Sequence, residues 1–163
     1  MKANAFTGNS DGITVNHTCL AAHIGLGVGS NEREKKNEQR SHAIDHVDHV
    51  RKAAEQGDAG AQGFLGLKYE HGMGVTQDYA EAVKWYRKAA DQGYAAAQYN
   101  LALTYDEGKG VTQDSVEAHM WFNLAAARGN YHAAKSRDLV AKRMAPAQIA
   151  EAQRRAAKWR PRR

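Results

Sequence analysis

Residues 51–86 read RKAAEQGDAGAQGFLGLKYEHGMGVTQDYAEAVKWY, and residues 87–122 read RKAADQGYAAAQYNLALTYDEGKGVTQDSVEAHMWF. The two stretches align without a gap, and 21 of the 36 aligned positions are identical. A third copy starts at Asn123 and then diverges. A period of 36 residues is typical of solenoids that are built from pairs of helices.

Each unit of the repeat predicts two helices. In the unit that opens at Asp78, the first helix is expected over residues 79–92 and the second over residues 95–107. Gly93 and Gly108 are expected to end these helices, because glycine adopts the left-handed conformation that a helix C-terminus favours.

The helix starts carry their own signals. Asp78 is a favourable N-cap, and Glu81 three residues later predicts a capping box, in which each side chain bonds the other residue's backbone N–H. Asp114 and Glu117 repeat the pattern one period later.

Apolar residues recur at three- and four-residue spacings, so each helix presents one apolar stripe. On the first helix the stripe comprises Ala82, Trp85, Tyr86, Ala89 and Ala90. On the second it comprises Ala97, Leu101, Thr104 and Tyr105, with Ala102 beside it. Helices this short are marginal alone, so each pair is expected to bury its stripe against its neighbours, with Trp85 and Trp121 as bulk between units.

These features predict an all-α fold, an α/α superhelix (solenoid) of about three helix-turn-helix repeats with a C-terminal capping helix. The expected organisation is a poorly ordered leader (1–40), a solenoid (41–159) and a basic tail (160–163). Within the solenoid we expect units at 42–77, 78–113 and 114–149 and a cap at 146–159.

The run Gly-x-Gly-Val-x-x-Asp-x-x-x-Ala-x-x-Trp-Tyr-Arg-Lys-Ala-Ala-x-Gln-Gly-x-Ala-x-Ala-Gln-x-x-Leu, from Gly72 to Leu101, closely resembles the Sel-one-like repeat (SLR) family, relatives of the tetratricopeptide repeat. The resemblance covers about residues 42–159. It implies a solenoid that binds other proteins or peptides. The family has no common catalytic residues, so the resemblance implies no enzyme activity and no cofactor.

The two ends of the repeat region depart from the pattern. An earlier first helix is expected over residues 42–56, where His46 and His49 stand in place of Ala82 and Trp85, as in a polar terminal repeat. At the other end, residues 147–159 predict a closing helix, which we expect to cover the exposed face of the third unit; residues 160–163 then form a frayed basic tail.

Composition excludes several classes of protein. A single cysteine, Cys19, cannot form an intramolecular disulfide, and no apolar run approaches the length of a membrane-spanning helix. The leader lacks the basic start and solid apolar centre of a secretory signal. A cytoplasmic location is favoured, and a periplasmic or secreted one stays open if the leader is a signal or the true start differs.

Little in the sequence points to catalysis or metal binding. His42, His46 and His49 share one helix face, so a zinc or nickel site is conceivable, but no fourth ligand is evident and a solvated polar helix explains them better. Cys19 is the only thiol and lies in the segment that is least expected to be ordered, so catalysis there is not expected. We therefore expect no catalytic residue and no bound metal.

The positions at which the two copies differ on the first helix of each pair suggest a binding surface. In solenoids the first helices line the concave side, where a peptide or helix of another protein would bind. The candidate partner-binding residues are Tyr79, Val83, Lys84, Arg87, His119, Met120 and Asn123. Ordinary solvated side chains are an equally simple explanation for each of them.

An alternative partner is nucleic acid or another anionic surface. From Lys135 to Arg163 there are ten basic and two acidic residues, a net charge of +8 within a chain total of +5. The candidate residues for this alternative are Arg154, Arg155, Lys158, Arg160, Arg162 and Arg163. Such binding would weaken steeply with salt, whereas the simpler explanation is that the arginines favour the helix C-terminus and solubility.

Overall fold

The computed structural model describes residues 32–33, 35–36 and 47–162. The chain divides into two compact units, residues 1–36 and residues 37–163. In the first unit the four described residues are helical and exposed. Cys19, His42, His46 and nearly all of the predicted leader lie outside the described residues.

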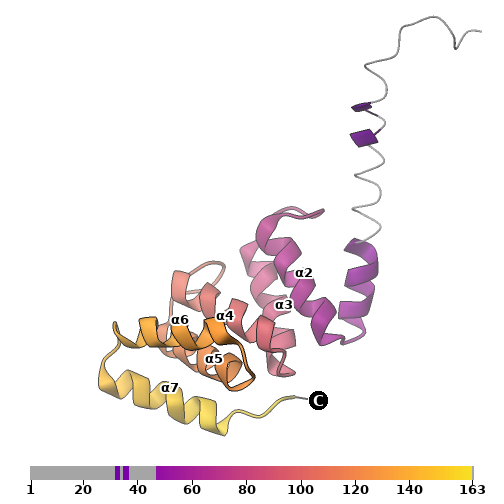
Figure 1. Cartoon of the computed structure of the whole chain (residues 1–163). Coiled ribbons are helices and arrows are strands. Elements are labelled where there is room, and N and C mark those ends of the chain that lie inside the picture. The colour runs from indigo at the N-terminus through magenta and orange to yellow at the C-terminus, as the bar shows by residue number, and fades with distance from the viewer. Residues whose placement is uncertain (1–31, 34, 37–46, 163) are drawn as a thin grey trace, which may run out of the picture. The chain divides into compact units, whose positions relative to one another are not determined.

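Residues 47–162 are all-α, as predicted, and no strand occurs among them (Figure 1). Residues 47–55 are helical. The helices that follow are α2 (Ala59–His71), α3 (Tyr79–Asp91), α4 (Ala95–Glu107), α5 (Ser115–Ala127), α6 (Tyr131–Ala141) and α7 (Pro146–Lys158). The predicted helices over 79–92, 95–107 and 147–159 are therefore confirmed to within a residue at each end.

The predicted N-caps form, but the capping boxes do not. The Asp78 carboxylate accepts hydrogen bonds from the N–H groups of Ala80 and Glu81. The reciprocal bond is missing because the N–H of Asp78 donates instead to the carbonyl of Tyr69 on α2, at 2.9 Å. Asp114 makes the same bond one repeat later, to Tyr105 on α4. Each loop is therefore fastened to the helix that precedes it.

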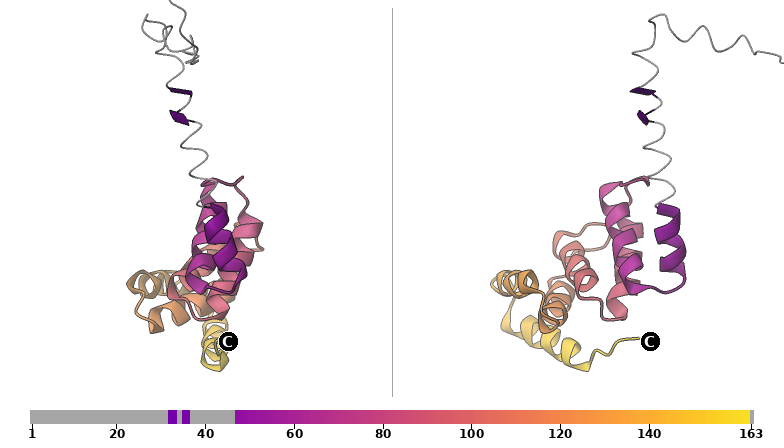
Figure 2. Two further views of the ribbon diagram at one scale, coloured as in Figure 1. Left: turned by 90° about the vertical axis from the view of Figure 1, so that its right-hand side faces the viewer. Right: turned by 45° about the vertical axis from the view of Figure 1, so that its right-hand side comes forward.

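The helices stack as pairs, with α2 against α3 and α4 against α5, while α3 also packs on α4 and α5 on α6 (Figure 2). The core is built from small and large side chains in alternation. Ala89, Ala90 and Ala97 are almost completely buried and allow close approach of the helices, while Tyr86 and Phe122 fill the space between pairs. Truncating a fully buried residue of this core, such as Leu101, to alanine should cost about 2–5 kcal/mol.

The two repeat tryptophans differ in environment. Trp121 is buried within the main core, whereas Trp85 is only partly buried and carries the ammonium of Lys88 over its ring, 4.0 Å from the ring centre. Trp85 packs instead against a smaller cluster formed by Val47, Ala54 and Leu65. This cluster joins the helical residues 47–55 to α2.

Helix α7 covers the expected third unit, residues 114–149, through α5 rather than through α6. It packs chiefly against α5, where Trp159 meets Trp121 at a ring-centre separation of 6.2 Å and Arg155 pairs with Glu117 at 2.7 Å. The outer face of α6 stays open, with Tyr131 and Leu139 highly exposed. The closing helix thus caps α5, the first helix of the expected third unit, and leaves the outer face of α6 uncovered.

The residues after α7 are not frayed. The backbone N–H of Arg162 donates to the carbonyl of Asp91 at the end of α3, at 2.8 Å, and its guanidinium lies 3.6 Å from the Asp91 carboxylate. The guanidinium of Arg128 stacks over the ring of Trp159, 4.8 Å from its centre. The tail through Arg162 therefore lies along the molecule, from α5 to α3.

Candidate functional site

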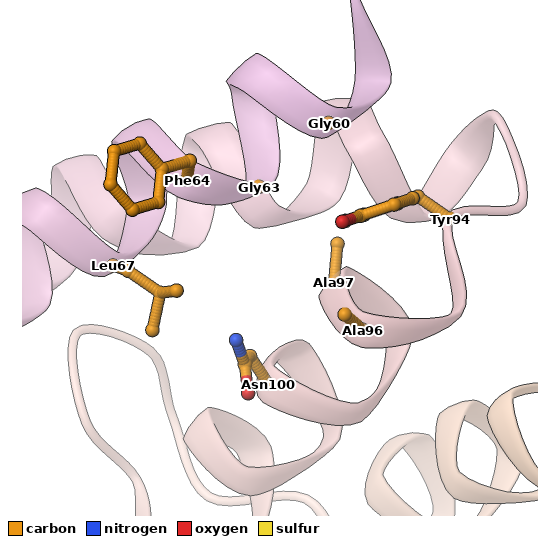
Figure 3. A pocket seen from close by; sticks show the side chains of 8 residues that line it. All are labelled: Gly60, Gly63, Phe64, Leu67, Tyr94, Ala96, Ala97 and Asn100. Carbon is orange, nitrogen blue, oxygen red and sulfur yellow. The ribbon is translucent and has the colours of Figure 1, made fainter. Parts of the chain in front are cut away.

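A cavity of about 70 Å³ opens between α2 and α4 (Figure 3). One wall comes from α2, with Phe64 and Leu67, and the other from the start of α4, with Tyr94 and Asn100. The remaining lining residues are small: Gly60, Gly63, Ala96 and Ala97. A concave, mostly apolar site with one polar amide is the usual form of a ligand or peptide site.

The shape of the cavity depends on a glycine in α2. A Cβ atom at Gly63 would lie 2.9 Å from Cε1 of Tyr94, closer than real side chains approach. The Tyr94 ring therefore rests directly on the backbone of α2 and forms one side of the cavity.

Tyr94 also departs from the capping rule of its repeat position. The equivalent residues, Asp58 and Asn130, each accept a hydrogen bond from the backbone of the helix that they begin. Tyr94 makes no side-chain cap bond. Losing such a cap costs about 1 kcal/mol, and residues that break a local rule in this way are often functional.

Two exposed aromatic side chains, Phe64 and Tyr94, line the cavity. Among the described residues, the exposed large hydrophobic side chains are Phe64, Met73, Tyr94, Tyr131 and Leu139. Four of these lie on α2, on α6 or at the start of α4, and the two nearest the cavity, Phe64 and Tyr94, are 40% and 42% exposed. Exposed apolar groups around a concavity are typical of an interaction site.

The sequence-predicted surface on α3 and α5 is mostly used for packing. Val83, His119 and Met120 are less than a tenth exposed and belong inside the molecule, so they cannot line an open groove in this conformation. Burial lowers the pKa of His119, the positive charge of Arg137 lowers it further, and Asp138 acts in the opposite sense.

The other four residues of that set have partners within the chain. Tyr79 accepts a hydrogen bond from Gln77 and lies under the ammonium of Lys109. Arg87 donates to the Tyr105 hydroxyl on α4, and Asn123 accepts from Arg137 on α6. Lys84 is exposed and pairs with Glu81 one turn away.

The structure therefore does not bring the seven residues together as an open surface. The copies differ at these positions because their neighbours differ, which the alignment of the two copies could not show. Binding by the exposed members, Lys84 above all, stays a prediction.

Most of the basic C-terminal residues have partners within the chain. Arg154 and Arg155 pair with Glu151, Arg155 also pairs with Glu117, and Arg162 pairs with Asp91. Arg160 donates to nearby backbone carbonyls, Lys158 is exposed, and Arg163 lies outside the described residues. These pairings offset much of the positive charge that suggested an anionic partner, and that alternative stays a prediction.

The metal hypothesis cannot be followed to its residues, because His42 and His46 are outside the described part of the chain. Within the described residues, no cluster of three or more histidine, cysteine or acidic side chains could hold a metal ion. No described helix has the length and apolar character needed to span a membrane.

The sequence argument missed Phe64, Leu67, Tyr94 and Asn100. A signal for them was present in the same alignment. Gly63 and Phe64 on α2 align with Tyr99 and Asn100 on α4, so the two copies differ at both positions. Tyr94, at a position where both neighbouring repeats have a capping side chain, was a second signal.

Pairs of helices that recur every 36 residues and pack side by side define an α/α solenoid repeat protein. The family model for the Sel1 repeat matches residues 47–58, 59–94 and 95–130, more than half of the chain. This chain belongs to the Sel1 repeat family, which commonly mediates protein interactions and is generally non-catalytic.

The family's repeats begin at α2 and α4, whereas the units expected from the sequence begin at the caps of α3 and α5. The period is the same and the starting point differs by half a repeat. In the family's phase, α2 and α4 are the first helices of their pairs.

Solved structures that are similar to this chain include the following two. One is a protective antigen present in uropathogenic Escherichia coli strains that displays an SLR fold, with 35% identity and a TM-score of 0.70 over 71% of this chain and 25% of that chain. The other is a Sel1 repeat protein from Oxalobacter formigenes, with 42% identity and a TM-score of 0.58 over 60% of this chain and 40% of that chain. This chain thus spans a quarter and two fifths of their lengths. Comparison with curated proteins gave no match.

Proposed function

We propose that this chain is a non-catalytic interaction module, a scaffold or adaptor that binds a peptide or helix of a partner protein. The proposed contact surface is the concave side of the first helices in the family's phase, α2, α4 and α6, with the α2–α4 cavity at its centre.

The observation that carries this proposal is the exposure of Phe64 and Tyr94 on opposite walls of an apolar cavity. Aromatic residues in partly enclosed sites are enriched among the residues that dominate binding energy. The rule that first helices line the concave surface supports the same helices once the family's phase is applied. The family's general role in protein interactions agrees with it.

A display library of random peptides, selected against the full chain, would test the proposal. Phe64→Asn copies the residue that α4 carries at the equivalent position, Asn100, so the helix should tolerate it. Loss of a central aromatic contact should weaken the selected peptides at least about tenfold, which corresponds to 1.4 kcal/mol.

The matched control is Met73→Asn, which removes an exposed hydrophobic residue in a loop away from the cavity. The control should change affinity less than about twofold, as expected for a surface change outside the contact. Failure to select any peptide, or peptides equally insensitive to Phe64→Asn and Tyr94→Asn, would contradict the proposed function.

A further inference from the structure

The side chain of Gln92, just after α3, joins two successive repeats. Its amide donates to the backbone carbonyl of Gly57, at 3.0 Å, and to Oε1 of Gln62, at 2.8 Å. Gln62 is buried, and its own amide donates to the carbonyl of Ala54, at 2.9 Å. Both polar atoms of this buried side chain therefore have a partner.

One period later the same network is incomplete. The equivalent residues are Arg128, Gly93 and Gln98. Gln98 is completely buried, and its amide donates to the carbonyl of Ala90 at 3.1 Å, as Gln62 does to Ala54. Its Oε1, however, finds no donor among the described residues. A buried acceptor without a donor costs free energy and requires an explanation.

The residue that could supply this donor, Arg128, lies close by but contacts the C-terminal segment instead. A Cβ atom at Gly93 would lie 3.1 Å from Nη2 of Arg128, so the guanidinium already rests over the equivalent turn. It is stacked on the ring of Trp159, 4.8 Å from the ring centre. Arg128 therefore contacts Trp159 in this structure and leaves Oε1 of Gln98 without a partner.

We infer that residues 159–162 form a strap with a docked and a released position, and that Arg128 has a different partner in each. With the strap docked, Arg128 stacks on Trp159. With the strap released, Arg128 donates to Gln98 and to the carbonyl of Gly93, as the equivalent glutamine does one repeat earlier. The hydrogen bonds gained on release offset the contacts that are lost, so the two positions are close in free energy.

The docked strap is held by few contacts, and these are open to solvent. The ring of Trp159 is partly buried and meets the ring of Trp121 at a centre separation of 6.2 Å. The backbone N–H of Arg162 donates to the carbonyl of Asp91. The side chain of Arg162 is 84% exposed, so its ion pair with Asp91 contributes little. A segment held in this way can open without unfolding the helices.

The docked position opposes any partner that binds the basic end of the chain. In it Arg162 faces Asp91, and the ring of Trp159 is covered by Trp121 and Arg128. Release presents both strap residues to solvent, and a partner that binds them shifts the equilibrium toward release. The strap shares no residue with the α2–α4 cavity, so this inference and the proposed function stand or fail separately.

Nuclear magnetic resonance of the full chain tests the inference. Arg128→Gln copies Gln92, so the new side chain should bond Gln98 and release the strap. The backbone order parameters of Trp159 and Arg162 should then fall from about 0.85, typical of rigid backbone, to below about 0.6. The matched control is Arg154→Gln, an arginine of α7 that pairs with Glu151, and it should leave the order parameters unchanged.

Removing the strap tests the released position directly. In a chain that ends at Lys158, Arg128 should move to Gln98. The side-chain amide signals of Gln98 should therefore shift, whereas those of Gln62, the internal control, should stay in place. Signals of Gln98 that do not respond, or a strap that stays ordered in Arg128→Gln, would overturn the inference.

A third variant separates an exchange of partners from a simple loss of stacking. Arg128→Ala removes the contact with Trp159 without supplying a donor for Gln98. Both variants should release the strap, but Arg128→Gln should unfold at a higher urea concentration, because its buried acceptor is satisfied. Equal urea midpoints for the two variants would show that position 128 makes no bond to Gln98, which contradicts the inference.

Discussion

Helices α3 and α5 hold the same place in successive repeats, yet one is half exposed and the other is buried on almost every side. On α3 the residues Lys84 and Lys88 are exposed. Their counterparts on α5 are Met120 and Leu124, both buried in a core cluster that also contains Ala152 and Ala156 of α7. The exposure of a repeat position therefore depends on which helix packs against that copy. Helix α7 packs on α5 and buries residues whose counterparts on α3 are exposed.

The largest expected effect comes from removing α7 and the tail, residues 146–163. Met120, Leu124 and Trp121 would then face solvent, and losing the burial of even two such side chains costs about 3–6 kcal/mol. Urea unfolding should show this loss, and light scattering should show self-association, which exposed apolar surface favours.

The control for the deletion replaces two buried residues of α5 by the residues that α3 carries at the equivalent positions. Met120→Lys with Leu124→Lys gives α5 the exposed face of its counterpart. In the truncated chain these changes should restore a monomer, whereas in the full chain they should destabilise. A truncated chain that is as stable as the full one would show that α7 is not a cap.

Exchanging the residues at one pair of equivalent positions, Met120 on α5 and Lys84 on α3, should have a smaller effect on stability. Met120→Lys in the full chain places a charge at a buried site and should cost about 3 kcal/mol. Lys84→Met at the equivalent exposed site should change stability by less than about 0.5 kcal/mol. Similar costs for the two variants in urea unfolding would show that α3 and α5 have the same environment.

The dependence of stability on pH should also differ between the two helices. At the position just before Met120 and Lys84, α5 carries His119 and α3 carries Val83. The pKa of His119 is lowered by burial and by Arg137, so the folded state holds it neutral while the unfolded chain binds a proton below about pH 6.5. The contribution of neutral His119 to the stability of the fold is therefore complete above that pH. It is lost as the pH falls through the lowered pKa.

His119→Val copies the α3 residue and should remove part of the loss of stability on going from pH 7 to pH 5. The measurement is the urea midpoint of both proteins at several pH values. Parallel curves for wild type and variant would mean that His119 titrates alike in the folded and unfolded states.

The smallest effect is expected for the ion pair that links α5 to α7. Glu117 pairs with Arg155 at 2.7 Å and accepts a hydrogen bond from Trp121. Its counterpart Glu81 pairs, among the described residues, with the exposed Lys84 alone. Glu117→Gln should cost about 1 kcal/mol and Glu81→Gln about 0.3 kcal/mol. Thermal melts at low and high salt would check the order of the two.

The sequence predicted what depends on neighbours along the chain. The caps at Asp78 and Asp114 and the glycine at Gly108 are local signals, so the bounds of α3 and α4 could be placed to a residue. The apolar stripe of α7 showed that the helix would pack, but not that its partner would be α5. Such contacts join residues far apart in the chain, and periodicity carries no information on them.

The candidate site, too, could be predicted only as far as local sequence signals reach. The comparison of two copies pointed to variable positions, but variation on α5 turned out to reflect burial under α7. The copies also differ on α2 and at Tyr94, where the structure has a cavity. In the alignment these differences look the same as those on α5. Burial is the property that separates the two kinds of difference, and only the packed structure supplies it.

The position of α7 also sets where this array of repeats can grow. A duplicated copy of residues 59–94 would present a charged outer helix and the same loop fastening through the N–H of its capping aspartate, so it could be inserted before α4. A further pair packed on the Met120 and Leu124 face of α5 would have to displace α7, which covers that face. Lengthening by gene duplication is therefore simpler within residues 59–94 than against the face of α5 that α7 covers.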